Sequence, residues 1–197
     1  MSVKALVLLA DGFETVEACF PIDILVRCGY QVSTASVSTA SKKQARSAHN
    51  VVIQTDGMVE DMEDQSYDVI VLPGGMPGAT TLGKSATVKK MLQNQADKKR
   101  WIAAICAAPA EVLAANNLLG GAKGVCYPAE QFQKAMGDSL VHGHVYTDDA
   151  HRLITGDGPA SAALFGFTIA KHLGTPQDKI NQLSSGMVFD QQFFCNQ

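Results

Sequence analysis

The amino-acid sequence predicts an α/β protein with a mostly parallel β-sheet that is covered by helices on both faces. Short apolar segments, including Val3–Leu9, Asp68–Leu72 and Trp101–Ile105, contain few polar residues, which is typical of strands buried on both faces. Amphipathic segments of helical length alternate with these strands. This alternation supplies the crossover connections that parallel neighbours require.

The elements of the first half follow directly from this pattern. The strand Val3–Leu9 turns at Asp11-Gly12 into a helix from Glu14 to Cys28, and Gly29 stops that helix. Pro21 falls inside the helix, where proline predicts a kink or an irregular start. The next predicted elements are a strand Tyr30–Val37, a polar loop Ser38–Ser47, a short strand Val51–Ile53, the strand Asp68–Leu72 and a helix Ser85–Ala96.

The second half continues the alternation. The strand Trp101–Ile105 leads through Cys106 into a helix over Ala107–Ala115. The remaining predicted elements are strands Leu140–Tyr146 and Arg152–Thr155 joined by a turn at Asp148-Asp149, a helix Pro159–Leu173 with proline in its first turn, and a last helix that begins at Thr175. No linker or repeat interrupts the chain, so we expect one domain over residues 1–197.

The composition excludes several classes of function. The chain has 46% hydrophobic and 18% charged residues and a formal net charge of −3, which is typical of a soluble globular protein. A slightly acidic chain is not expected to take nucleic acid or an anionic membrane as its main partner. The basic clusters Lys42-Lys43 and Lys98-Lys99-Arg100 are interpreted as solvated turns. No apolar run approaches the ~20 residues of a membrane span.

The cysteines and histidines indicate where the protein works and what it does not bind. Five cysteines, at positions 19, 28, 106, 126 and 195, lack Cys-x-x-Cys spacing, which favours a reducing compartment over disulfides or zinc. The segment before residue 10 is interpreted as a strand and not as a signal peptide, so we expect a cytoplasmic protein. His142 and His144 are expected on one exposed strand face, and no metal or nucleotide cofactor is expected.

Cys106 is the most informative residue. It stands between a buried strand and a helix, as nucleophiles do in hydrolases that expose them above a sheet. The dipole and free N–H groups of a helix N-terminus favour an anion, which predicts a lowered thiol pKa. The alternative is a cysteine buried as a small apolar residue, which is common.

Three features fall at predicted strand ends, namely Asp11-Gly12, Gly74-Gly75 and Cys106. Because ligands of parallel sheets bind outside the carboxyl ends of the strands, this convergence indicates a real site. Glu17 lies on the first helix among apolar residues. If it points into the site, burial raises its pKa and a protonated carboxyl can donate to the Cys106 thiolate or act as a general acid and base. Otherwise Glu17 lies on a solvated helix face.

The glycine pair offers backbone donors. Gly74-Gly75 lets backbone N–H groups approach without a side chain, and the amides of Gly75 and Ala107 are the candidate oxyanion hole. The alternative is an ordinary glycine turn. No histidine follows Cys106, whereas cysteine proteases need an imidazole base, so peptidase activity is not expected.

Three segments together carry a resemblance to a known family. Residues 5–17 (ALVLLADGFETVE), 67–75 (YDVIVLPGG) and 103–109 (AAICAAP) closely resemble the ThiJ/PfpI superfamily, in its parkinsonism-associated, DJ-type deglycase branch. The resemblance implies a flavodoxin-like three-layer α/β/α sandwich of the class I glutamine amidotransferase type, and a homodimer. It assigns the nucleophile to Cys106, its partner carboxylate to Glu17, and the oxyanion-hole amides to Gly75 and Ala107.

The resemblance also implies the activity. Members act as glyoxalases without a cofactor, turning methylglyoxal into lactate, and remove such aldehydes from glycated side chains. Chaperone activity and protection against oxidative stress are also attributed to them. An enzyme is therefore the first hypothesis. The second is a redox sensor in which Cys106 is oxidised to a sulfinic acid that Glu17 stabilises. The third is a chaperone, for which no sequence feature discriminates.

Gly74, Tyr127 and Asp157 are expected to line the pocket around the reacting residues. The sequence departs from the family at Tyr127 and Asp157. Tyr127 replaces a histidine and cannot act as a base at neutral pH. Asp157 replaces an arginine, which reverses a charge and weakens anion binding. Gln54 replaces a second cysteine of the family. The remaining thiols are assigned by position: Cys126 as a candidate resolving cysteine, and Cys19 and Cys28 as packing residues on the first helix.

Overall fold

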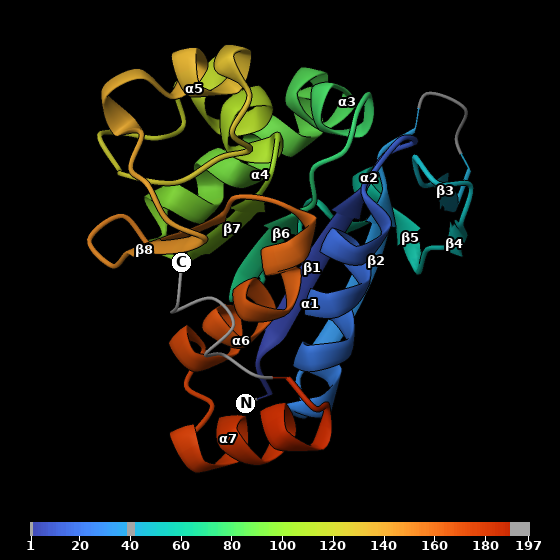
Figure 1. Ribbon diagram of the computed structural model, residues 1–197. Coiled ribbons are helices and arrows are strands. Elements are labelled where there is room, and N and C mark those ends of the chain that lie inside the picture. Colours follow the sequence, from blue (N-terminus) through green and yellow to red (C-terminus); the bar gives the residue numbers. More distant parts are fainter. Residues whose placement is uncertain (1, 39–41, 190–197) are drawn as a thin grey trace.

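A seven-stranded sheet of order β5-β2-β1-β6-β7-β9-β8 organises the computed structural model, which describes residues 2–38 and 42–189 (Figure 1). Every neighbouring pair in it is parallel except β8 and β9. The strands are β1 (Lys4–Leu9), β2 (Gln31–Ser36), β5 (Gly57–Met58), β6 (Val69–Leu72), β7 (Trp101–Ile105), β8 (Val145–Asp148) and β9 (Leu153–Gly156). The predicted mostly parallel sheet is confirmed.

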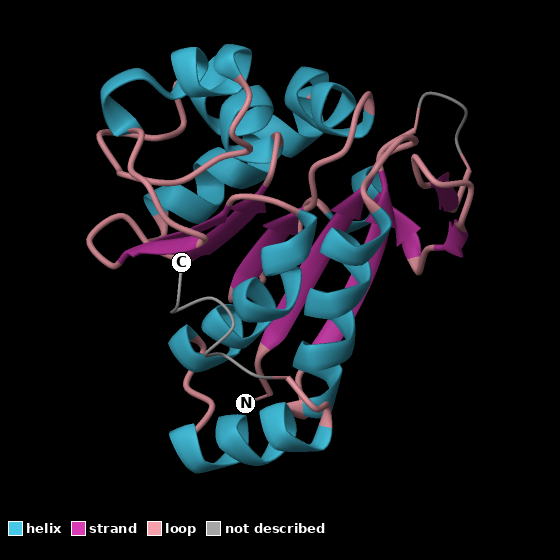
Figure 2. Cartoon of the chain, in the orientation of Figure 1, coloured by secondary structure: helices cyan, strands magenta, loops and turns pink. Residues whose placement is uncertain are grey.

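Helices cover both faces of this sheet (Figure 2). Alternate residues of β1 point to opposite sides: Ala5, Val7 and Leu9 enter one core, and Leu6 and Leu8 enter the other. The first core is completed by α1 (Thr15–Arg27), α6 (Ala162–His172) and α7 (Gln177–Gly186), and the second by α2 (Val59–Met62), α3 (Gly78–Lys84) and α4 (Ala86–Asp97). A further helix is α5 (Glu130–Met136). The protein is a three-layer α/β/α sandwich of flavodoxin-like type.

The first helix forms where the sequence predicts it. Glu14 and Cys28 are the residues that cap α1 at its two ends. Pro21 lies inside the helix and is buried. There α1 packs closely on α6, since a Cβ added at Gly166 would lie 3.3 Å from the Cα of Pro21.

A small hairpin replaces part of the loop predicted over Ser38–Ser47. Its strands β3 (Gln44–Arg46) and β4 (Val52–Gln54) pair antiparallel and form a second sheet. The hairpin is attached to the start of α1, because the Gly12 amide donates to the Arg46 carbonyl at 2.7 Å and the Thr15 hydroxyl to that of Ser47 at 2.8 Å. The loop prediction was wrong because β3 is short and polar and gains its order from these contacts.

The predicted strand Leu140–Tyr146 was also wrong in its bounds. β8 begins only at Val145, and Leu140 forms no more than an isolated bridge with Gly124. Gly143 has a φ of 143°, which breaks the extended backbone between Leu140 and Val145. His142 and His144 therefore do not share a strand face.

The segment after Cys106 is helical but not a regular α-helix. A turn over Cys106-Ala107 leads into a π-helix (Pro109–Leu113) and a 3-10 helix (Ala114–Asn116). Gly83 of α3 packs so closely on this segment that a Cβ there would overlap the Glu111 carbonyl. Short π segments are frequent beside functional sites.

Candidate active site

The carboxyl ends of neighbouring strands bring the predicted site residues together. The order β1-β6-β7-β9 is parallel throughout, with Leu72 paired to Ala104 and Ile105 paired to Gly156. The segments that follow these strands therefore leave the sheet at one edge. They carry Asp11-Gly12, Gly74-Gly75, Cys106 and Asp157.

Cys106 lies at the first position after β7 in a strained conformation. Its φ is 64°, in the left-handed region that residues other than glycine rarely adopt. Two backbone hydrogen bonds hold it there: its amide donates to the Gly156 carbonyl at 2.9 Å, and its carbonyl accepts from the Tyr127 amide at 2.8 Å. The residue is 8% exposed. This geometry is the strand-to-helix elbow that the sequence predicts.

Glu17 reaches the same place from α1. The residue is fully buried, and its Oε2 accepts a 2.8 Å hydrogen bond from the Gly74 amide. Its carboxyl also interacts with the Cys106 thiol. The other oxygen, Oε1, has no nitrogen or oxygen partner within the described residues. The solvated helix face that was the alternative for Glu17 is excluded.

The glycine loop after β6 supplies the backbone donors. The amides of Gly75 and Ala107 hydrogen-bond the Cys106 sulfur. Gly75 has a φ of 84°, and a Cβ there would lie 2.5 Å from the Gly12 carbonyl oxygen. A Cβ at Gly74 would lie 2.7 Å from the Cβ of Cys106. Both positions therefore require glycine, and the amides of Gly75 and Ala107 point at the atom where the chemistry is expected.

Burial dominates the ionisation of the pair. It raises the pKa of Glu17 from 4.5 to about 7. The hydrogen bond from Gly74 and, to a smaller extent, that from the Cys106 thiol act in the opposite direction and lower this pKa. Burial also raises the pKa of Cys106, and the charge and hydrogen bond of Glu17 raise it further. The amides of Gly75 and Ala107 lower it. The predicted lowering of the thiol pKa is therefore wrong while Glu17 is ionised.

A proton on Glu17 changes this balance. Its charge then vanishes, and the carboxyl becomes a hydrogen-bond donor to sulfur, so two of the causes that raise the pKa of Cys106 are removed. Burial, the largest cause, continues to raise the pKa of the thiol. A thiolate beside a neutral carboxyl is one of the protonation states of this coupled pair.

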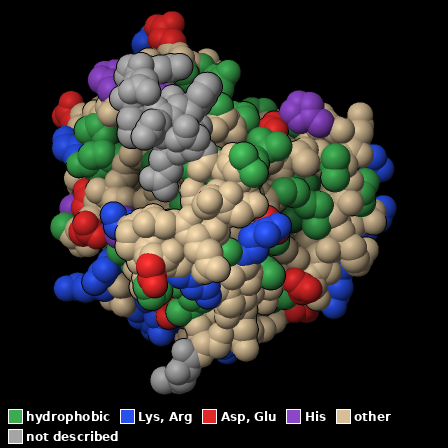
Figure 3. Space-filling model, turned by 60° about the horizontal axis from the view of Figure 1, so that its bottom comes forward, with side chains coloured by type: hydrophobic (Ala, Val, Ile, Leu, Met, Phe, Trp, Pro, Cys, Tyr) green, Lys and Arg blue, Asp and Glu red, His purple; other side chains and the backbone are tan. Residues whose placement is uncertain are grey.

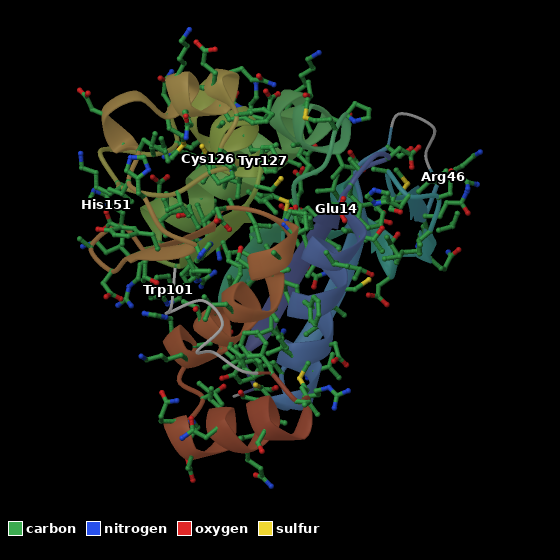
Figure 4. All side chains as sticks on the ribbon, viewed as in Figure 1. Glu14, Arg46, Trp101, Cys126, Tyr127 and His151 are labelled. Carbon is green, nitrogen blue, oxygen red and sulfur yellow. The ribbon has the colours of Figure 1, made fainter. Side chains whose placement is uncertain are left out.

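Tyr127 and Asp157 lie at the rim of the site. Figure 4 shows Tyr127 beyond the strand ends, at the same end of the sheet as Glu14, while Trp101 marks the opposite end of β7. The Tyr127 side chain packs edge-on against Phe132 with ring centroids 6.4 Å apart. Asp157 forms a 2.8 Å ion pair with Nδ1 of His144.

His144 is a rim residue that sequence reasoning missed. It precedes β8, and no motif or spacing in the sequence links it to Asp157, which lies 13 positions further on. The expectation of an exposed strand histidine was wrong because antiparallel pairing of β8 with β9 returns the chain to the site.

The other thiols are placed as follows. Cys28 is buried, as predicted, whereas Cys19 is exposed, so its prediction as a packing residue was wrong. Cys126 is buried, its Sγ lies 3.5 Å from the Tyr127 carbonyl, and burial raises its pKa to about 11. Cys195 lies outside the described residues.

Residues 2–38 and 42–189 contain neither a metal-binding cluster nor a membrane-spanning helix. No cluster of three or more His, Cys, Asp or Glu side chains there is arranged to hold a metal ion. No helix in the same residues combines the length and apolar character needed to cross a membrane. On the face shown in Figure 3, acidic and basic side chains are interspersed.

A strained cysteine above a parallel sheet, with a buried carboxyl and two amides around its sulfur, defines a cysteine-centred α/β sandwich protein. The model of the DJ-1/PfpI family matches residues 3–172. The chain belongs to the DJ-1/PfpI family.

Similar proteins agree with this assignment. The Parkinson disease protein 7 homolog of Danio rerio is 34% identical over 86% of this chain and 89% of its own length. The glutathione-independent glyoxalase DJR-1.2 of Caenorhabditis elegans is 33% identical over 91% of this chain and 93% of its own. The structure of oxidized DJ-1 from Toxoplasma gondii superposes with a TM-score of 0.89 at 33% identity, covering 95% and 99% of the two chains.

Proposed function

We propose that this protein is a cofactor-independent glyoxalase and protein deglycase that acts on methylglyoxal-type aldehydes and on their adducts with side chains. The observation that carries the proposal is the buried Cys106–Glu17 pair, in which the carboxyl interacts with the thiol and the amides of Gly75 and Ala107 hydrogen-bond the sulfur. A nucleophile, a proton carrier and oxyanion donors are what this chemistry needs. The similarity to a relative named as a glyoxalase supports it.

In the proposed reaction the Cys106 thiolate attacks the aldehyde carbon of methylglyoxal. The carbonyl π electrons move to oxygen, which takes the proton of Glu17, and a hemithioacetal results. Ionised Glu17 then removes the proton from the carbon bonded to sulfur, which leaves an enediolate, and returns it to the neighbouring carbon. The proton of the hydroxyl on the carbon bonded to sulfur passes to the former ketone oxygen, so that a C=O bond forms next to sulfur and a hydroxyl forms on the neighbouring carbon. The product is a lactoyl thioester. Water hydrolyses it to lactate and restores the thiol pair. The sum is methylglyoxal plus water giving lactic acid.

In an adduct the aldehyde-derived carbon carries a hydroxyl and the side-chain nitrogen. The Cys106 thiolate bonds to that carbon as the C–N bond breaks, and the amine leaves with the proton of Glu17. The same hemithioacetal results, and it rearranges and is hydrolysed as above. Tyr127 stands where a histidine base is frequent in the family, so Glu17 has to activate the water. We therefore expect the hydrolytic step to limit deglycation. The expected result in the cell is protection against reactive aldehydes and oxidative stress.

Turnover of methylglyoxal by the purified protein tests the proposal. Cys106→Ser and Glu17→Ala are each expected to lower kcat/KM by at least about a hundredfold. Cys126→Ser is the matched control, because it removes another buried thiol from the segment that contacts Cys106 through Tyr127. Equal turnover by the wild type and the two site variants would refute the enzymatic proposal.

The second candidate function is redox sensing. The Gly75 and Ala107 amides that bond the Cys106 sulfur are placed to hold sulfinate oxygens, and protonated Glu17 adds another donor. The intact mass after mild peroxide, followed by peptide mapping, tests this function. Cys106 is expected to gain two oxygens before the other cysteines do; prior oxidation elsewhere contradicts it.

We also propose that two copies of the chain associate in the reducing cytoplasm, each folded as one domain over residues 1–197. Exposed apolar side chains on α1 and on the neighbouring β3–β4 hairpin suit such an interface, namely Val16, Phe20, Val26, Val51 and Val52. All four cysteines within the described residues are free, which fits a reducing compartment. Analytical ultracentrifugation of the wild type and of Phe20→Lys tests the homodimer: a monomeric wild type contradicts it.

A further inference from the structure

Asp157 is held near the Cys106 backbone by the two residues that flank it in the chain. The preceding residue, Gly156, accepts the Cys106 amide at 2.9 Å. The following residue, Gly158, faces the Tyr127 ring, since a Cβ there would lie 3.4 Å from Cδ2 of Tyr127. The Tyr127 amide in turn donates to the Cys106 carbonyl. These contacts form a closed ring that holds Asp157 at the rim of the site.

The Asp157 side chain is also held in one orientation. Its Oδ2 lies 2.8 Å from Nδ1 of His144, and its backbone amide donates to the His144 carbonyl at 2.9 Å. The side chain of Asp157 is 26% exposed and that of His144 is 37% exposed. The carboxylate is therefore partly exposed at the rim and near enough to the buried pair to act on the charge of Glu17.

The charges around the site are acidic. Glu14 and Asp157 both act on Glu17 and raise its pKa, which shows that their fields reach the reaction centre. Within the described residues, the ion pairs of Glu14 and Asp157 are made with histidines, His49 at 3.4 Å and His144 at 2.8 Å, and not with lysine or arginine. Among residues 2–38 and 42–189, a permanent positive charge therefore does not pair with either carboxylate.

We propose that Asp157 is a specificity-determining residue that makes the site disfavour substrates with a carboxylate next to the reacting carbon. Neutral 2-oxoaldehydes, and adducts carried on positively charged side chains, are the substrate class it favours. The assignment of these molecules as substrates rests on the proposed glyoxalase and deglycase function. The charge selection itself applies to any reagent that approaches Cys106.

A pair of alkylating reagents of matched shape tests the proposal without using the enzymatic activity. Iodoacetamide is neutral and iodoacetate is an anion, and their rates at Cys106 are followed by peptide mass spectrometry at low ionic strength. The ratio of the two rates is divided by the ratio for N-acetylcysteine, which removes the intrinsic difference in reactivity. The wild type is expected to prefer the neutral reagent by roughly tenfold more than the free thiol does.

Two variants assign this preference to Asp157. Asp157→Asn is expected to lower the preference several-fold, whereas Asp157→Glu keeps the charge and is expected to retain it. A wild-type ratio equal to that of the free thiol, or an unchanged ratio in Asp157→Asn, overturns the proposal. A protein that shows the predicted ratios but does not turn over methylglyoxal supports the charge selection and refutes the glyoxalase function, so the two failures are distinguishable.

Discussion

The backbone amide of Gly74 donates a 2.8 Å hydrogen bond to Oε2 of Glu17, joining residues 57 positions apart in the chain. The loop that supplies the sulfur-binding amide of Gly75 thus also orients the carboxyl that interacts with the Cys106 thiol. One loop therefore affects the pKa of the thiol and that of the carboxyl.

The buried carboxyl predicts a stability that falls as pH rises. Folding raises the pKa of Glu17 from 4.5 to about 7, so between these values the folded state keeps a proton that the unfolded state has lost. This contribution is present below about pH 4.5, and up to about 3 kcal/mol of unfolding free energy is lost as pH passes 7. The substitution Glu17→Gln is expected to remove this pH dependence of the unfolding free energy.

Urea unfolding near pH 5 and near pH 8 measures this effect. The Gln variant is expected to gain stability relative to the wild type at the higher pH. The exposed Glu60→Gln is the control, with no such difference. A Glu17→Gln difference that is the same at both pH values contradicts the assigned shift.

Gly75→Ala is expected to destabilise the fold by about 2–4 kcal/mol and to abolish methylglyoxal turnover. The new Cβ meets backbone atoms of Gly12 and Glu14, which cannot move without displacing α1. Gly120→Ala is the matched control, because Gly120 also has a positive φ, of 58°, but has nothing within 4 Å. Thermal unfolding with parallel assays compares them. An equal cost at both glycines would show that the close approach at Gly75 has no importance.

The strained backbone at Cys106 predicts an unusual order of stabilities. At most positions a glycine variant is less stable than an alanine variant. At a φ of 64° the order reverses, and the unfolding free energy of Cys106→Gly is expected to exceed that of Cys106→Ala by about 1 kcal/mol. Ala108→Gly, at a φ of −64°, is the control and is expected to lose about 1 kcal/mol. Denaturant unfolding of the three variants measures these differences. If Cys106→Ala is more stable than Cys106→Gly, the backbone at Cys106 is not strained.

Tyr127→His tests whether the tyrosine limits hydrolysis. The side chain is 42% exposed, so the fold is expected to tolerate the change. An imidazole at this place supplies a base near neutral pH, and the rate of deglycation of a methylglyoxal-treated peptide is expected to rise by about tenfold or more, with its increase between about pH 6 and 7. Tyr127→Phe is the control and gains nothing. A histidine variant with the wild-type rate would place the limiting step elsewhere.

The sequence was sufficient wherever local pattern decides the structure. Apart from Lys4, the strands β1, β6 and β7 are apolar, and the ends of β6 and β7 fix where Gly74-Gly75 and Cys106 meet. The approach of Glu17 to Cys106 followed from the family resemblance, since the local pattern alone also allowed a solvated helix face for Glu17.

Features that depend on tertiary contacts were missed. The hairpin strand β3 is polar and owes its order to its contacts with the Gly12–Thr15 turn. His144 meets Asp157 only because β8 turns back onto β9. The thiol pKa was misjudged for the same reason: a helix terminus is visible in the sequence, whereas the burial of Cys106 and the charge of Glu17 exist only in the folded chain.

The position of β7 between β6 and β9 has a consequence for how the chemistry arises. The sulfur is surrounded by groups from the loop after β6 and by the end of β9, so no fragment of the chain that stops before Leu153 contains the site. The environment of the thiol is therefore a property of the assembled sheet, and a product of synthesis or proteolysis that ends before Leu153 lacks it.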